Sequence, residues 1–226
     1  MRTVTLAISA IVLGAIALVK EANASVASSG IPLIGKTKLD SFYLRYKNTI
    51  DSECKRLEIP ISTAVATLSV ESSGKPFGSD GKLLINFEPK VFKKVMAKDG
   101  YSVDETFYGG TQYLEYKSFD IARSLNEFNA FWSISMGMAQ IMGFNYKTMG
   151  YNSPMEMYND FQSSEDAQIR SFFIFCEYNK GGVLLNAIKS SDYDTFAHYY
   201  NGPENIGYGN KILSAKQKFQ KETGIE

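Results

Sequence analysis

The stretch that decides the fold is Ile61-Ser-Thr-Ala-Val-Ala-Thr-Leu-Ser-Val-Glu71, followed by Ser72-Ser73-Gly74. Gly74 is a typical helix stop, so the sequence predicts a helix over 61–72. Ala64, Leu68 and Glu71 recur at spacings of four and three, which places Glu71 on the apolar stripe. Burial there would raise the pKa of the carboxyl group and make Glu71 a candidate proton donor. At the rim of the stripe, the same side chain would only bond to nearby backbone.

Apolar residues at spacings of three and four predict further helices on both sides of this stretch. They cover about 38–57, 89–98, 118–128, 137–149, 165–179, 183–190, 192–200 and 209–222, and the capping box Ser153-Pro154-Met155-Glu156 starts one more at 154. The turn signal Ser79-Asp80-Gly81-Lys82 predicts a small β-hairpin over 75–88, and 99–117 is a long loop. The sum is a mainly α domain with one small β-hairpin.

The N-terminal segment 1–24 differs from the rest of the chain. Arg2 precedes an apolar stretch over 4–19, and Ala22-Asn23-Ala24 follows as a small-x-small cleavage pattern, which is typical of a secretory signal peptide. Left uncut, residues 4–19 would act as a signal anchor, although a bilayer span usually needs about 17–25 residues. We therefore expect an exported protein, periplasmic or extracellular, or tethered to the inner membrane. Residues 25–37 form a linker and 38–226 the folded domain.

Composition excludes several classes of function. The chain has 226 residues, 44% of them hydrophobic, which suits one globular domain with a sizeable core, and it carries 24 basic and 24 acidic side chains. We expect the protein to be a monomer. A net charge of zero gives no reason to expect nucleic acid as a partner. The single histidine, His198, disfavours a serine triad or a histidine-rich zinc site, and no metal or organic cofactor is expected. Cys54 and Cys176 would either pair, as exported cysteines do, or stay as two small buried thiols.

Two later segments carry polar groups suited to sugar binding. In Gly137-Met-Ala-Gln-Ile141, the amide of Gln140 would orient an acetamido group or support a backbone turn. In Tyr199-Tyr-Asn-Gly-Pro203, two rings end a helix beside Asn201; they would stack on sugar faces or pack against the protein.

Together these segments resemble the N-acetylmuramidase domain family of lysozyme-like peptidoglycan hydrolases, found in phage endolysins and bacterial proteins. The resemblance covers about 57–220. The matching stretches are Val70-Glu-Ser-Ser-Gly74, Asp80-Gly81, Ile85-Asn-Phe-Glu88, Gly109-Gly-Thr-Gln-Tyr113, Gly137-Met-Ala-Gln-Ile-Met-Gly-Phe-Asn145, Phe196-Ala197 and Tyr200-Asn-Gly-Pro203. One departure is Ser135-Met136-Gly137, where the family tends to show Ser-Trp-Gly.

The resemblance implies a lysozyme-like α+β fold that cleaves the β-1,4 bond between N-acetylmuramic acid and N-acetylglucosamine. It implies Glu71 as the general acid and peptidoglycan glycan strands as the partner. Gln140, Tyr200, Asn201 and Glu88 would line the groove. A hydrolase that inverts would need a second carboxylate to activate water. Asp80 and Glu88 are the candidates, unless Asp80 only makes the turn and Glu88 only caps the next helix.

Two other functions fit the same motifs. Lytic transglycosylases share the glutamate, glutamine and tyrosine-asparagine segments, and they form a 1,6-anhydromuramic product by internal attack. A non-catalytic wall-binding protein could use the same scaffold. The sequence does not distinguish these functions; the chemical structure of the released products would.

Overall fold

The computed structural model describes residues 38–72, 75–202 and 207–226, all within the unit Ile34–Glu226. The predicted signal segment and linker, and Gly74, lie outside the described residues. Within those ranges, no helix combines the length and the apolar character needed to cross a membrane. The helices are α2 (Lys38–Leu57), α3 (Ile61–Ser72), α4 (Pro89–Lys98), α5 (Gln112–Leu125), α6 (Glu127–Trp132), α7 (Pro154–Ser163), α8 (Glu165–Tyr178), α9 (Val183–Ser190), α10 (Tyr193–Asn201) and α11 (Tyr208–Thr223).

Most helices lie where apolar periodicity places them, because each buries the stripe that defines it. The α8 stripe of Ile169, Phe172, Phe173 and Cys176 is fully buried. At the start of α7, the Ser153 side chain accepts a hydrogen bond from the Glu156 N–H at 3.0 Å, as the capping signal predicts. The loop after α4 is shorter than expected, because Thr111 caps a helix that begins at Gln112.

Helix α3 is surrounded rather than amphipathic. Every side chain from Ser62 to Leu68 is fully buried, and the helix packs against α2 and α11. Small residues make this close packing feasible, and the hydroxyl of Thr67 donates back to the Thr63 carbonyl at 2.8 Å. The predicted one-sided stripe is therefore too narrow a description of this helix.

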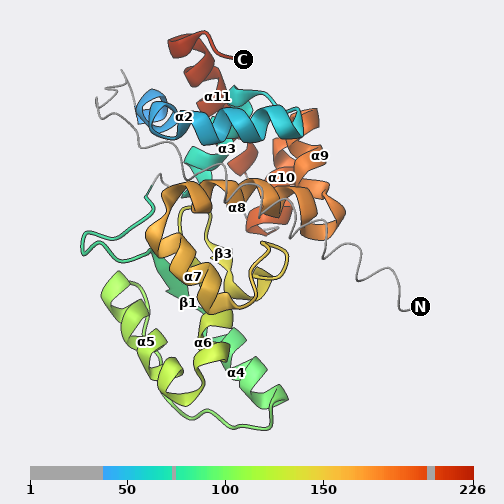
Figure 1. Ribbon diagram of the computed structural model, residues 1–226. Helices are drawn as coiled ribbons and strands as arrows, with labels where there is room; N and C mark the ends of the chain where they lie inside the picture. The colour runs from blue at the N-terminus through green and yellow to red at the C-terminus, as the bar shows by residue number, and fades with distance from the viewer. Residues whose placement is uncertain (1–37, 73–74, 203–206) are drawn as a thin grey trace. The chain divides into compact units, whose positions relative to one another are not determined.

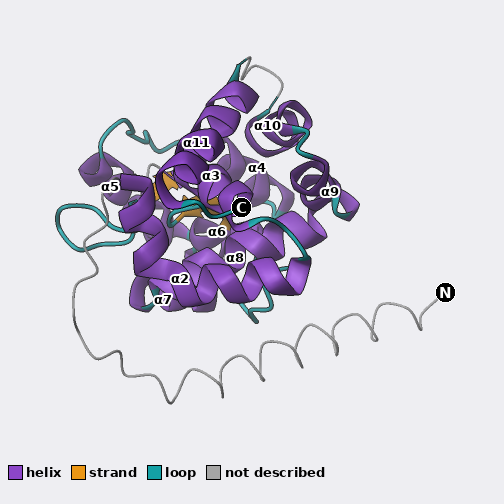
Figure 2. Cartoon of the chain, turned by 90° about the horizontal axis from the view of Figure 1, so that it is seen from above, coloured by secondary structure: helices purple, strands orange, loops and turns teal. Residues whose placement is uncertain are grey.

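The described sheet has three short antiparallel strands in the order β1 (Ile85–Phe87), β2 (Ile134–Met136) and β3 (Ile141–Met142). Ile85 pairs with Met136, and Met136 pairs with Ile141. Figure 1 shows the sheet with α4, α5 and α6 below the group formed by α2, α3 and α8–α11. Viewed from above in Figure 2, the strands lie among the helices.

The predicted helix over 137–149 is wrong. Residues 137–140 form a tight turn between β2 and β3, followed by the 3-10 helix η2 (Gly143–Asn145). Two positive φ angles, +71° at Gly137 and +47° at Gln140, exclude a continuous α-helix. The Gly137 N–H instead donates to the carbonyl of Leu84 at 2.8 Å, in the segment leading into β1.

The hairpin predicted over 75–88 forms only in part. Phe77 and Leu83 make an isolated antiparallel bridge around the turn, and the Gly78 N–H donates to the Lys82 carbonyl at 2.8 Å. The segment beyond Leu83 pairs with β2 instead of with residues before the turn.

Candidate active site

The last turn of α3 brings Glu71 from the core toward the surface. Burial is complete up to Leu68, whereas Ser69 and Val70 are only partly buried. The backbone of Glu71 is helical, and its side chain lies outside the described residues. The helix therefore leaves the core over its last turn.

A tyrosine from α11 holds this last turn in place. The final four carbonyl groups of a helix have no partner within the helix. The Tyr208 hydroxyl donates to one of them, the Val70 carbonyl, at 3.0 Å. Tyr208 was not singled out by the sequence analysis, because nothing in its local pattern indicates a contact so far along the chain.

Gln140 supports the β2–β3 turn, one of the two roles expected of it. Its amide oxygen accepts from the Ser135 hydroxyl at 2.9 Å, and its amide nitrogen donates to the Gly137 carbonyl at 2.9 Å. The residue is nevertheless exposed. One N–H and one lone pair of the amide remain for a ligand, because a glutamine offers two of each.

Gln168, a buried side chain on α8, fixes the position of this turn. The Met138 N–H donates to the amide oxygen of Gln168 at 2.8 Å, and Gln168 donates in turn to the Phe161 carbonyl at 2.8 Å. A Cβ on Gly137 would lie only 2.7 Å from that same oxygen, so the position suits glycine. Met136 is fully buried, which makes the Trp-to-Met departure a matter of core packing.

Tyr200 joins α10 to the same turn. Its hydroxyl donates to the Ala139 carbonyl at 2.7 Å, and its half-buried ring stacks on Phe196 with centroids 5.2 Å apart. Neighbouring Tyr199 is the exposed ring of the pair, 39% exposed, with the Lys180 ammonium 4.9 Å from its centroid. The Asn201 side chain lies outside the described residues.

Glu88 lies where β1 ends and α4 begins. It occupies the N-cap position, but its side chain makes no capping hydrogen bond; the carboxylate accepts from the Asn86 amide at 2.7 Å. Partial burial raises the pKa of Glu88, and the nearby charge of Glu115 acts in the same direction, while the Asn86 hydrogen bond opposes both. The helix-cap alternative therefore does not account for this carboxylate.

Glu115 is a second carboxylate of this region that the sequence analysis missed. It is 7% exposed and accepts hydrogen bonds from the Phe87 N–H at 2.8 Å and the Gly110 N–H at 3.0 Å. It thereby ties the loop before α5 to β1. Nothing in a single sequence distinguishes it from a surface glutamate in the first turn of a helix.

Asp80, the other candidate for a second carboxylate, makes the turn. It is exposed, and its carboxylate accepts from the Lys82 N–H at 3.1 Å, a bond that closes an Asx turn. His198 is exposed on α10 with its ring edge on Tyr199. No group of three potential metal ligands occurs among the described residues.

Both cysteines are free and buried. Cys54 lies on α2 and Cys176 on α8. Burial raises the pKa of the Cys54 thiol to about 12, so it stays protonated at neutral pH. Of the two alternatives from sequence, the structure contains the buried thiols.

Comparison with known proteins matches residues 60–220 to the family model Muramidase, described as N-acetylmuramidase. The chain belongs to the N-acetylmuramidase family. The match contains α3, the sheet and the tyrosine-bearing end of α10, and it places the protein among the peptidoglycan hydrolases. No curated protein matches the chain.

A solved structure supports the assignment independently. The crystal structure of the Burkholderia AP3 phage endolysin superposes with a TM-score of 0.69 at 27% identity, over 77% of this chain and 71% of the other. The expected mainly α, lysozyme-like α+β fold is thereby confirmed. In this N-acetylmuramidase, Tyr200 and Gln140 meet at the 137–140 turn, whereas Glu88 belongs to the opposite end of the β1–β2 pairing.

Proposed function

We propose that this chain hydrolyses the β-1,4 bond between N-acetylmuramic acid and N-acetylglucosamine in peptidoglycan, with Glu71 as the general acid. The observation that carries the proposal is the family match over 60–220, which spans the α3 helix that ends in the Glu71 turn. A general acid at neutral pH needs a raised pKa, which apolar neighbours can give a carboxyl group. Glu71 donates its proton to the glycosidic oxygen as the bond breaks.

The second step needs a water molecule and a base. Glu88 is the better candidate for this base, because its carboxylate is half-buried and its hydrogen-bond partner among the described residues is the Asn86 amide. Its raised pKa makes it a stronger base than an exposed carboxylate. Asp80 is a weaker candidate, since its oxygen already closes a turn. If Glu88 takes this role, the reaction inverts at the anomeric carbon.

Gln140, Tyr200 and Asn201 position the sugars in this proposal. The free N–H of Gln140 is suited to an acetamido carbonyl. Tyr200 acts through the 137–140 turn, because its hydroxyl is already bonded to the Ala139 carbonyl. Export through the 1–24 segment brings the enzyme to its substrate, which N-terminal sequencing of the exported protein would test.

The test is digestion of purified peptidoglycan by the wild type and by Glu71→Gln. A Gln side chain keeps the shape and cannot donate a proton as an acid, so we expect a loss of at least about 100-fold in rate. Binding to the insoluble wall should persist, which a pull-down measures. Equal rates for the two proteins would overturn the role of Glu71.

Mass spectrometry of the released fragments identifies the reaction. Hydrolysis leaves a reducing muramic acid end, whereas transglycosylation leaves an anhydro end. Anhydro ends as the main product would replace the hydrolase with a lytic transglycosylase. A wild type that binds the wall and releases nothing would point to a wall-binding protein.

A further inference from the structure

A pocket of about 440 Å³ opens on the surface of α5 beside the 79–82 turn. It is lined by Lys82, Tyr113, Tyr116, Lys117, Asp120 and Ile121. Its volume falls in the range of roughly 300–1,000 Å³ typical of small-ligand sites. None of the residues proposed to cleave or hold the glycan belongs to it.

Two ammonium groups in this pocket form no ion pair with the carboxylates of the described residues. Lys82 lies over the ring of Tyr116, 4.8 Å from its centroid, and Lys117 lies 4.5 Å from the ring centroid of Tyr108. Neither lysine takes part in an ion pair within the part of the chain that the structure describes. Contact with a ring face orients an ammonium group without neutralising it, so both can still bind an anion.

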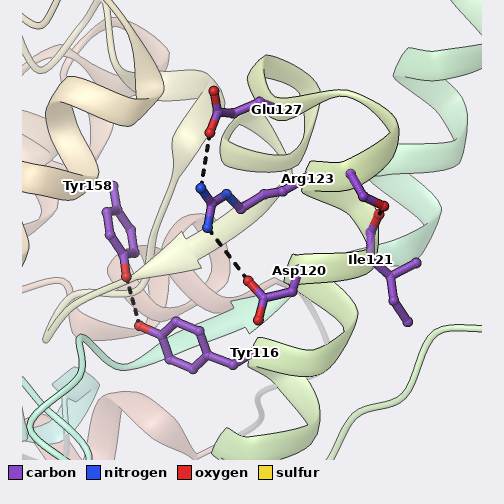
Figure 3. A network of polar contacts seen from close by, with 7 residues as sticks. Tyr116, Asp120, Ile121, Arg123, Glu127 and Tyr158 are labelled. Atoms are coloured by element: carbon purple, nitrogen blue, oxygen red, sulfur yellow. Dashed lines mark hydrogen bonds and ion pairs between the residues drawn. The ribbon is translucent and has the colours of Figure 1, made fainter.

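The ring beneath Lys82 is held in place by the fold. Tyr116 is buried, its hydroxyl donates to the Leu83 carbonyl at 2.8 Å, and it lies 3.0 Å from the Tyr158 hydroxyl. Figure 3 shows this pair of tyrosines beside the Asp120–Arg123–Glu127 chain of ion pairs. The ring that supports Lys82 is therefore fixed by the fold, so the lysine is held over a preformed surface.

The pocket also contains a negative group and an apolar one. Asp120 contacts Arg123 at 3.6 Å through one oxygen, and its side chain is 67% exposed. The Tyr113 ring lines the pocket and is 76% exposed, so no described residue covers it. Two cations, one carboxylate and one exposed ring suit a short peptide that carries carboxylates and an amine.

We infer that this pocket binds the peptide stem of peptidoglycan, with Lys82 and Lys117 on its carboxylates and Asp120 on the amine of its diamino residue. The inference rests on the proposed function, because the stem is attached to the muramic acid of the same substrate. A neutral sugar chain would leave both ammonium groups unpaired, so the charges of the pocket favour the stem over the glycan itself. Tyr113 covers the apolar part of the peptide.

The test compares two substrates: soluble glycan strands with their stems, and the same strands after an amidase has removed the stems and the muramic carboxylates that it frees have been converted to neutral amides. The variant is Lys82→Gln with Lys117→Gln. The control is Lys94→Gln with Lys218→Gln, which removes two exposed lysines from α4 and α11 and so changes the net charge equally. All four side chains are exposed, and unchanged thermal unfolding should confirm that each protein folds.

We expect the pocket variant to raise KM about tenfold on stem-bearing strands with kcat nearly unchanged, the scale of two exposed charge contacts. On stripped strands the pocket variant should match the wild type. The control variant should match the wild type on both substrates. Equal KM on stem-bearing strands would overturn the inference. An equal loss on both substrates, or the same loss in the control, would also overturn it, since the contact would then be to the glycan or a general attraction.

A direct measurement separates this inference from the proposed function. The free stem peptide released by the amidase is titrated into each protein by calorimetry, with no cleavage involved. The pocket variant should bind it about tenfold more weakly than the wild type and the control. If the wild type cleaves neither substrate, the proposed function fails while the titration still decides the pocket. No peptide binding to the wild type would refute the pocket alone.

Discussion

Replacing Gly137 with alanine should destabilise the protein by about 2–4 kcal/mol, more than backbone strain alone explains. The first contribution is conformational. At φ = +71°, an alanine pays about 1 kcal/mol that glycine does not. The second comes from the new Cβ, which would lie 2.7 Å from the amide oxygen of Gln168.

That collision is costly because Gln168 cannot move freely. It is 1% exposed, and its amide bonds the Met138 N–H and the Phe161 carbonyl, each at 2.8 Å. Moving the amide leaves at least one buried polar group without a partner, at about 1–3 kcal/mol. Added to the strain, this gives the expected total.

Gly81 provides the matched control. Its φ of +73° is nearly the same, and a Cβ there would meet nothing within 4 Å. Gly81→Ala should therefore cost only the strain, about 1 kcal/mol. The measurement is urea unfolding of both variants at 25 °C, with the free energy of unfolding extrapolated to water.

The reasoning fails if Gly137→Ala and Gly81→Ala have the same effect within about 0.5 kcal/mol. A further check is the double variant with Gln168→Ala. Shortening Gln168 removes the collision, so the two substitutions together should cost less than the sum of their separate effects. Strict additivity would show that the contact does not matter.

Three other predictions follow from single side chains. Met136→Ala should lower the free energy of unfolding by about 2–5 kcal/mol, because it empties a fully buried position; an effect under 1 kcal/mol in urea would contradict this. The pKa of Glu88 in the folded protein is raised above 4.5. The free energy of unfolding of the wild type should therefore fall, relative to that of Glu88→Gln, as the pH rises from 4.5 through the folded pKa. Urea unfolding of both proteins at pH 4 and at pH 7 measures this difference. Cys54 and Cys176 should both react with a thiol reagent after unfolding without reductant and neither before; a missing thiol would indicate a bridge.

Helices whose signal is local could be read from the sequence, and pairings between distant segments could not. The Ser153 cap and the buried stripe of α8 are each determined by residues within one or two helical turns of one another. The β2–β3 turn is different, because apolar spacing over 137–149 also suits a helix. What decides against a helix is the pairing of β3 with β2, together with the hydrogen bond from the Gly137 N–H to the Leu84 carbonyl, far earlier in the chain. Gly137 was visible in the motif, but its positive φ was not.

The sequence predicted individual site residues, whereas the structure shows how some of them are linked by hydrogen bonds. Gln140 and Tyr200 were predicted to position sugars, yet Tyr200 donates to the Ala139 carbonyl, and Gln140 bonds the Gly137 carbonyl and the Ser135 hydroxyl of β2. The glutamine and tyrosine motifs are therefore one structural unit, joined through the Ala139 carbonyl. The Tyr208 hydroxyl serves the Glu71 turn in the same way, through the Val70 carbonyl. Gln140 and Tyr200, which belong to separate motifs, thus hold one turn, and substituting either should displace that turn even where the side chain never contacts a sugar.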